Sequence, residues 1–178
     1  MAIDFDGPPA LAPLPEGIVL RTFDPDHDVD RLFDIYEATF RDHFGYVVRT
    51  REVAFARWHH MVMEHTTYDP SLITLAEADG EVVGFCVGWP DENAPGSNGY
   101  IHHLGTVRNW RRRGLARALL THGFIQFYER GAKRVTLGVD SANPTGALDL
   151  YEKSGMYIKA STTSMKLLLR EGAIPSHY

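Results

Sequence analysis

The sequence predicts one domain of the α/β (α+β) class. The chain has 178 residues, 44% of them hydrophobic, which suits a single sizeable core. The spacing of the apolar residues changes several times between the helical period and the strand period. Read along the chain, these changes predict the order β-α-α-β-β-β-α-β-α-β-β, with no internal repeat.

The first residues differ from the rest in composition. Residues 1–16 hold four of the ten prolines and have neither helical nor strand periodicity, so we predict an extended Pro-rich arm or linker. The folded domain is then expected to cover residues 17–178. Its first strand is predicted at residues 18–23.

Two helices are predicted after this strand. Asp28 is a candidate N-cap for a helix over residues 29–40, where Leu32, Tyr36 and Phe40 recur at helical spacing. A second helix is predicted over residues 51–65. Its apolar side would be formed by Ala54, Trp58, Met61 and Val62.

The apolar period then becomes that of strands. Residues 72–89 read as a strand, an Asp-Gly turn and a second strand, which is a strong local signal for a hairpin. In the rest of the chain, glycines mark the predicted ends of elements and the loops between them. The remaining predicted elements are a loop at 90–99, a strand at 100–107, a helix at 114–130 that ends at Gly131, a strand at 134–139, a helix at 143–155 and two short strands within 156–169.

Composition excludes several classes of protein. There are 18 Lys and Arg against 23 Asp and Glu, and the formal net charge of −5 gives no general attraction for nucleic acid or anionic lipid. No apolar run approaches the roughly 20 residues that cross a bilayer, and no signal peptide is recognised, so we expect a cytoplasmic protein. The single cysteine, Cys86, excludes an internal disulfide and is expected to be a buried strand residue.

The stretch NWRRRGLARALL, residues 109–120, crowds three arginines just before the predicted helix 114–130. The first amide N–H groups of a helix have no partner inside it, and together with the positive end of the helix dipole they attract anions. A glycine lets the backbone approach closely, and arginines add charge and paired donors. A phosphate-bearing ligand and a solvated turn both stay open at this point. Walker and dinucleotide-binding patterns are absent from this stretch.

Two segments resemble the GNAT superfamily of acetyl-coenzyme A dependent N-acetyltransferases. RRRGLA, residues 111–116, matches the Arg/Gln-x-x-Gly-x-Gly/Ala pattern, and SANPTGALDLYEKSGM, residues 141–156, resembles the second signature of the family. The predicted order of elements also agrees with that fold. The resemblance implies a central mixed, mostly antiparallel sheet of about seven strands, with helices on both faces. It also implies a split between the fourth and fifth strands, here 100–107 and 134–139.

Within the superfamily, residues 100–169 are most similar to the C-terminal half of the mycothiol synthases, which are tandem proteins of two such domains. The Pro-rich arm would then be an interdomain linker. The chain would be one half of a longer tandem protein or a stand-alone relative. A tandem GNAT partner and a homodimer are both left open.

The resemblance implies that acetyl-CoA binds in the split and that its acetyl group passes to a primary amine by direct attack in a ternary complex, leaving coenzyme A. The amine is expected to belong to a small molecule or a peptide. The competing class is a non-catalytic domain that binds acyl-CoA as a sensor or tandem partner. The residues implied in cofactor binding are Leu104, Gly105 and Thr106 on the fourth strand, Arg111, Arg112, Arg113, Gly114, Leu115 and Ala116 at the turn, and Asn143.

Tyr151 matches the tyrosine that serves as the acid in this family. A phenol with an ordinary pKa of about 10 stays protonated at pH 7 and can donate to the departing thiolate. The alternative is that Tyr151 only packs on the sheet from an amphipathic helix. The resemblance favours the acid.

The base is less defined. The position that aligns with the glutamate of many relatives is Tyr100, which cannot act as a carboxylate. His102 lies two residues on, faces the same side of the predicted strand and titrates near neutrality, so it is the candidate base, directly or through water. His103 is expected to point the other way. Both histidines could instead simply fill a half-buried strand, and some acceptors need no dedicated base.

The remaining histidines and acidic residues raise two questions, whether the chain has a metal site and where the acceptor binds. His59, His60 and His65 lie on one predicted helix but do not share a face, so no metal site is expected. The acceptor pocket is expected between the first two helices. The residues placed there by family analogy are Glu37, Phe40, Phe44, Tyr46 and Glu64.

Overall fold

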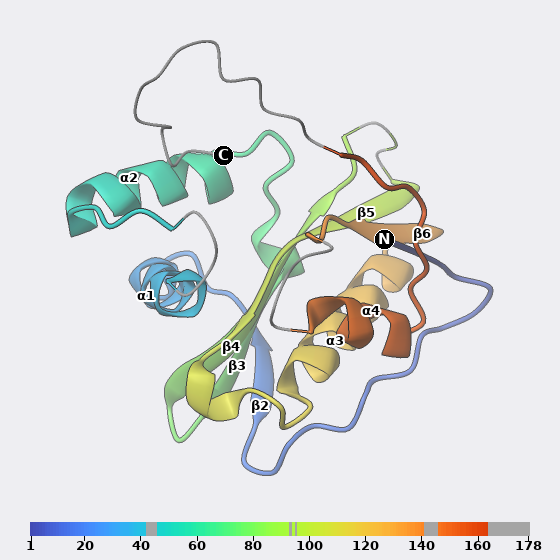
Figure 1. Ribbon diagram of the computed structural model, residues 1–178, viewed down its shortest axis with the longest axis horizontal. Coiled ribbons are helices and arrows are strands. Elements are labelled where there is room, and N and C mark those ends of the chain that lie inside the picture. The colour runs from blue at the N-terminus through green and yellow to red at the C-terminus, as the bar shows by residue number, and fades with distance from the viewer. Residues whose placement is uncertain (42–45, 93, 95, 141–145, 164–178) are drawn as a thin grey trace.

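A six-stranded mixed sheet forms the centre of the structure (Figure 1), a computed structural model that describes residues 1–41, 46–92, 94, 96–140 and 146–163. The strand order is β1-β6-β5-β4-β3-β2, and every neighbouring pair is antiparallel except β5 and β6. The prediction of a mixed, mostly antiparallel sheet is confirmed, although about seven strands were expected. The strands are β1 (Ala2–Asp4), β2 (Val19–Thr22), β3 (Ile73–Ala78), β4 (Glu81–Pro90), β5 (Asn98–Thr106) and β6 (Arg134–Leu137).

Helices cover both faces of the sheet, as predicted (Figure 1). One face carries α1 (Val29–Phe40) and α2 (Arg51–Val62), and the other carries α3 (Leu115–Glu129) and α4 (Ala147–Lys153). Two short 3₁₀ turns, η1 (Pro70–Leu72) and η2 (Arg108–Trp110), precede β3 and follow β5. Within the described ranges, no helix has the length and apolar character needed to span a bilayer.

Both ends of the chain differ from their predictions. Residues 1–16 are not a free arm, because Ala2–Asp4 pairs antiparallel with β6 and the amino group of Met1 donates to the Leu137 carbonyl at 2.7 Å. Three residues are too few to establish a strand period, and their partners lie at least 130 residues away along the chain. At the other end, two strands were predicted within 156–169. The described part of that segment has only an isolated bridge from Tyr157 to Ala2, and residues 164–169 lie outside the described residues.

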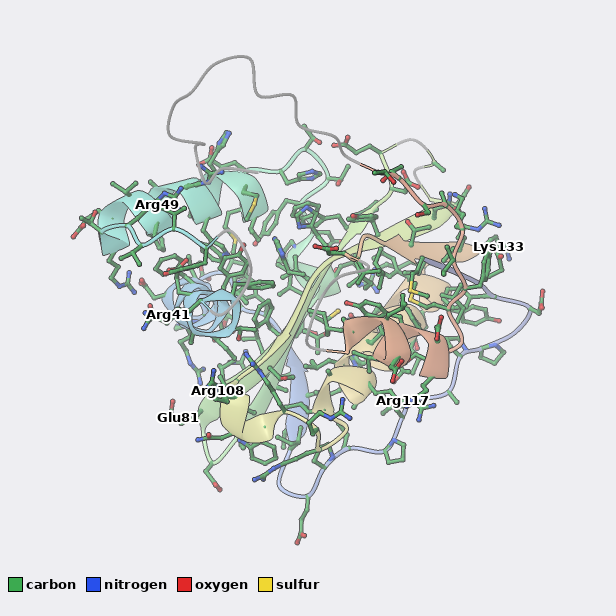
Figure 2. The ribbon with its side chains drawn as sticks, in the orientation of Figure 1. Arg41, Arg49, Glu81, Arg108, Arg117 and Lys133 are labelled. Atoms are coloured by element: carbon green, nitrogen blue, oxygen red, sulfur yellow. The ribbon has the colours of Figure 1, made fainter. Side chains whose placement is uncertain are left out.

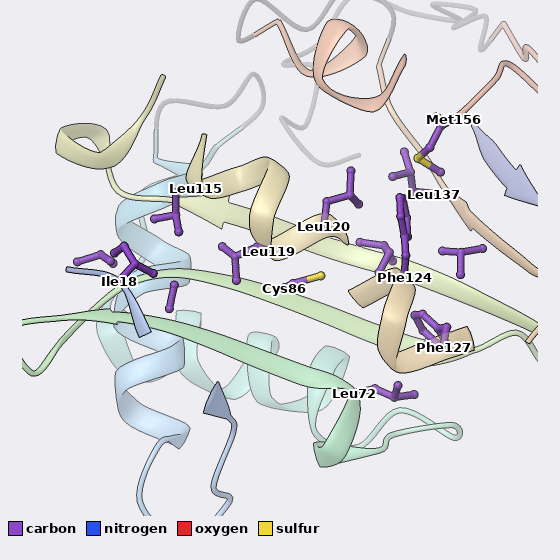
Figure 3. Packing of buried hydrophobic residues seen from close by; sticks show 14 of the residues in the cluster. Ile18, Leu72, Cys86, Leu115, Leu119, Leu120, Phe124, Phe127, Leu137 and Met156 are labelled. Atoms are coloured by element: carbon purple, nitrogen blue, oxygen red, sulfur yellow. The ribbon is translucent and has the colours of Figure 1, made fainter. Parts of the chain in front are cut away.

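The larger of the two cores lies between α3 and the sheet (Figure 3). The predicted helical spacing is confirmed, since Leu115, Leu119 and Phe124 all point from α3 onto the strands and are at most 1% exposed. Burying one such side chain contributes roughly 1.5–3 kcal/mol. Cys86 lies in this core, as predicted, and burial raises the pKa of its thiol to about 12.

The second core joins α1 and α2 to the opposite face of the sheet. Phe33 and Trp58 pack there on Phe85 and other strand residues, and all three are at most 3% exposed. The rings of Phe33 and Phe55 meet edge to face, with centroids 5.1 Å apart. This packing holds α1 against β4 and β5, and the end of α1 forms one wall of the cleft described below.

A buried carboxylate holds the start of α1. Asp28 occupies the predicted N-cap position, but its side chain makes no cap to the helix. It accepts instead from the Asp24 amide at 2.8 Å and from the Arg21 guanidinium, which also reaches Glu77 at 2.8 Å. The Arg21 hydrogen bond holds the pKa of Asp28 below its ordinary value despite burial.

Candidate active site

The two parallel strands diverge, as the resemblance implied. β6 pairs with β5 only from Asn98↔Arg134 to Ile101↔Leu137. β5 continues beyond this point to Thr106, where β4 is its only strand partner among the residues that the structure describes. The backbone groups of β5 that face away from β4 are therefore left for a ligand over the last residues of the strand.

A cleft of about 850 Å³ opens at this divergence. Its walls come from β5, η2, the start of α3, the residues just after β6, α4 and the C-terminal end of α1. Most of the predicted site residues line it. The lining residues that matter below are Phe40, His102, His103, Leu104, Gly105, Thr106, Arg108, Trp110, Arg111, Arg112, Gly114, Ala116, Arg117, Gly146 and Tyr151.

The turn before α3 has two left-handed residues. Gly114 is the N-cap of the helix with a φ of 89°, and Arg112 has a φ of 62°. Glycine adopts this region freely, whereas another L-residue is strained there by about 1–2 kcal/mol. The helix leaves the amides of its first turn, from Leu115 onward, without an acceptor inside the helix, so they are free to meet an anion.

The three consecutive arginines diverge. Arg111 and Arg112 line the cleft, but the guanidinium of Arg113 lies over the Trp110 ring, 4.9 Å from its centroid. Arg111 donates through Nε to the Thr106 carbonyl at 3.3 Å, which ties the turn to the end of β5. The side chain of Leu115 is buried in the core, so only its amide could contact a ligand.

Further cations at the same end of the cleft were not anticipated. Arg108 lies on the turn after β5, and Arg117 lies beside α4, where it donates to the Lys153 carbonyl at 2.9 Å (Figure 2). The spacing of Arg117 after Gly114 places it on the first turn of α3, and this signal could have been used. Lys153 could not have been found in this way, because its position depends on how α4 packs.

The fourth-strand residues lie where the resemblance implied. Leu104, Gly105 and Thr106 line the cleft, and they pair with Cys86, Phe85 and Gly84 on the β4 side only. A Cβ at Gly105 would lie 2.6 Å from the Phe85 ring and 2.7 Å from Thr39, so glycine lets these two side chains pack directly on β5. Asn143 lies outside the described residues, and its role stays a prediction.

A β-bulge overturns the predicted orientation of His103. Val87 pairs with His103 and Gly88 with Ile101, so His102 is an extra residue in β5. The extra residue breaks the strict alternation of side chains. The two imidazoles are consequently neighbours, with Nδ1 of His102 and Nε2 of His103 hydrogen-bonded at 2.8 Å, and both line the cleft.

The imidazole pair is surrounded by aromatic rings. Trp89 contacts both His102, at 4.0 Å between centroids, and His65, at 3.8 Å. Burial lowers the pKa of His102 to about 4, with a smaller contribution from His65, and lowers the pKa of His103 to about 3. The expectation that His102 titrates near neutrality is therefore wrong, and the neutral ring prevails at pH 7.

Tyr151 lies on α4 and faces the same cleft, while its ring packs against the α3 core. Burial raises the pKa of its phenol to about 12. The hydroxyl therefore stays protonated across the physiological range and is available as a donor.

The residues expected in an acceptor pocket do not come together. Phe40 lines the cleft, but Glu37 and Tyr46 belong to a separate cavity on the other side of α1, where the Tyr46 hydroxyl donates to Glu37 at 2.7 Å. Figure 2 shows Arg41 and Arg49, which line that cavity, beside α1 and α2. Glu64 contacts His59 and His60 instead, and Phe44 lies outside the described residues.

The open mixed sheet with helices on both faces is the architecture of the N-acetyltransferases that this chain resembles. The chain belongs to the acetyltransferase (GNAT) family, whose model matches residues 29–156. Proteins of this family use acetyl-CoA.

Curated relatives named mycothiol acetyltransferase agree with this assignment. The protein from Thermobispora bispora is 36% identical over 151 residues, which are 83% of this chain and 49% of the relative. The protein from Stackebrandtia nassauensis is 34% identical over 159 residues, 85% of this chain and 47% of the relative. The chain thus spans about half the length of the curated relatives it matches, and the matched part is their C-terminal half.

Solved structures share the fold. A GCN5-related N-acetyltransferase from Sphaerobacter thermophilus superposes with a TM-score of 0.73 at 38% identity and covers 89% of this chain and 47% of that chain. AAC(6')-Iy, solved in complex with a bisubstrate analogue, has a TM-score of 0.62 at 12% identity, and the match covers 85% of this chain and 98% of that one. This second likeness concerns the fold alone.

Proposed function

We propose that the protein transfers an acetyl group from acetyl-CoA to a primary amine by direct attack in a ternary complex. One observation carries the proposal: a single cleft, opened where β6 leaves β5, joins the cationic turn at one end to Tyr151 and the imidazole pair. The cationic end suits the phosphates of the cofactor, and the end with Tyr151 and the imidazole pair suits the transfer of the acetyl group. The family assignment supports the same activity.

The residues of the cleft fit the cofactor along its length. The amides of the first turn of α3 and the guanidinium of Arg112 would hold the diphosphate, because Gly114 leaves space within 4 Å of its missing Cβ. The pantetheine arm would lie along the unpaired edge of Leu104, Gly105 and Thr106 and hydrogen-bond to their backbone. The thioester would then lie near the bulge of β5.

The chemistry then needs two proton movements. The amine nitrogen, once neutral, attacks the thioester carbonyl carbon, and the C–S bond breaks as the amide forms. Tyr151, protonated because of its raised pKa, donates a hydrogen bond or its proton to the departing sulfur. The proton lost by the attacking nitrogen leaves through a neutral acceptor.

His102 is the acceptor that we assign to this step. Its Nδ1 is engaged with His103, which orients the ring and leaves Nε2 for the amine or an intervening water. Because the pKa of His102 is about 4, it cannot hold the proton for long at neutral pH, and the proton must pass on to solvent. The site therefore suits an amine that arrives already neutral.

We propose that the acceptor is a small molecule with a primary amine, or a peptide. The most specific candidate is a precursor of mycothiol, because the relatives at 30% identity or more carry the name mycothiol acetyltransferase. Since this chain spans about half of those relatives, their substrates are not transferred to it without a test.

The test is the release of coenzyme A thiol from acetyl-CoA across a panel of amines that includes amino sugars, α-amino acids, lysine and cysteinyl conjugates. Turnover with at least one amine, abolished in Tyr151→Phe, is the expected result. If coenzyme A raises the melting temperature but no amine is acetylated, the protein is an acyl-CoA-binding domain and the proposal fails. Mass spectrometry of the product identifies the acetylated nitrogen.

A further inference from the structure

The indole of Trp89 lies between two imidazoles. The centroid of the indole is 3.8 Å from that of His65, with the two planes 14° apart, and 4.0 Å from that of His102. Two imidazoles at these distances cannot share one face of the same indole, so His65 and His102 lie on opposite faces. One end of this stack is therefore the residue that we assign as acceptor for the proton of the attacking amine.

The other end of the stack is anchored through both ring nitrogens. His65 lies between α2 and η1, and its Nδ1 accepts from the Thr67 amide at 3.2 Å. The proton of the neutral ring is then on Nε2, which faces the Glu92 carboxylate at 3.7 Å. The Thr66 hydroxyl donates to the same carboxylate. These contacts hold the His65 ring in one plane, although its side chain is 27% exposed.

Packing, and no hydrogen bond from a described residue, holds the indole in the middle. Trp89 is 2% exposed, and its Nε1 has no hydrogen-bond partner among the residues that the structure describes. The plane of the indole therefore depends on the rings against its faces. An anchored, flat ring on one face limits how far the indole can tilt toward the other.

The tilt of the indole matters for His102. The hydrogen bond from Nδ1 of His102 to His103, at 2.8 Å, fixes one atom of the ring and leaves rotation about that contact possible. Contact with the face of Trp89 restricts this rotation. The direction of Nε2, the atom that we assign to the proton of the amine, thus depends on the stack as well as on His103.

We propose that His65 is a positioning residue for the acetyl transfer: acting through Trp89, it holds the plane of the His102 imidazole and with it the direction of Nε2. This inference rests on the proposed function and deepens it. His65 is not among the described residues that line the cleft, so it acts without touching the cofactor there. The proposal needs the flat ring of His65 more than its charge.

The experiment compares His65→Leu, which has no ring, with His65→Phe, which keeps a flat ring and removes the charge. The matched control is His60→Leu, where an exposed imidazole of α2 contacts Glu64. With an amine from the panel described above, His65→Leu should lower kcat about 3- to 10-fold and change the Kd for coenzyme A by less than about twofold. His65→Phe should keep kcat within about twofold of the native value, as should His60→Leu.

Nuclear magnetic resonance tests the same contact without turnover. An indole shifts the resonances of a ring that lies on its face, so the ring protons of His102 should lie upfield in the native protein and in His65→Phe. They should move downfield in His65→Leu. Spectra are recorded at about pH 8, well above the ordinary imidazole pKa of about 6.5, so that protonation does not mimic the shift.

Three results would overturn the proposal: a native kcat in His65→Leu, an equal loss of kcat in His65→Phe and His65→Leu, or His102 resonances that His65→Leu leaves in place. If thermal unfolding shows that His65→Leu does not fold, His65→Gln gives the same comparison with a polar side chain that has no ring. If no amine is acetylated, the proposed function fails, and the resonance comparison alone decides whether His65 holds the His102 ring.

Discussion

The substitution Gly114→Ala distinguishes the effect of the turn on the stability of the free protein from its effect on the affinity for coenzyme A. Gly114 has a φ of 89°, and a Cβ built there meets no heavy atom within 4 Å. The free protein should therefore lose only the left-handed penalty, about 1–2 kcal/mol. For a domain of this size that corresponds to a fall in Tm of roughly 2–8 °C. If a cofactor phosphate binds at this turn, as proposed, the added methyl group would occupy the space that the ligand needs.

The affinity for coenzyme A should accordingly fall by at least about tenfold in Gly114→Ala, because a phosphate can no longer approach the amides of α3. The matched control is Gly131→Ala, at the end of α3, where φ is 87° and no atom lies within 4 Å. Thermal unfolding should show the same loss in both variants, and calorimetry should show weaker binding in Gly114→Ala alone. Equal affinities in the two variants would refute the binding role of the turn.

Three other outcomes are expected. Tyr151→Phe should lower kcat by at least about 100-fold while the Kd for coenzyme A stays within twofold, and a matching fall in both would contradict an acid role. The free energy of unfolding should fall as pH drops from 6.5 towards about 4, because His102 takes up a proton more readily in the unfolded chain than in its buried native position. Urea unfolding measured at several pH values should show that the free energy of unfolding depends less steeply on pH in His102→Gln. Asp28→Asn should cost about 3 kcal/mol at pH 7 by urea unfolding, since it leaves Arg21 without its buried partner, and this difference should shrink as acid protonates the native carboxylate.

Local patterns predicted most of the fold. The β3–β4 hairpin was recognised from its Asp-Gly turn, and α3 from its apolar spacing and from Gly131, which has the left-handed φ of 87° expected after a helix. These signals work because each depends on residues close together in the sequence. The pairing of Ala2–Asp4 with β6 has no such signal, since the paired residues are at least 130 positions apart in the sequence.

The sequence predicted which residues belong to the candidate site better than it predicted how they are arranged in space. The turn at Gly114 and the tyrosine on α4 were found because family motifs mark them. The contact between His102 and His103 depends on a bulge, which is decided by the register between β4 and β5 and not by the residues of β5 alone. The same holds for Arg112, whose reach to α4 is a tertiary contact.

The three tryptophans of the chain give the protein built-in fluorescent reporters. Trp110 lines the cleft at its cationic end, Trp89 contacts the imidazoles of His102 and His65, and Trp58 is buried where α2 packs with α1 on the sheet. Variants that keep one indole at a time would follow cofactor arrival, the state of the reacting end and the integrity of the helical layer separately. Stopped-flow emission could then order these events in time without any added dye.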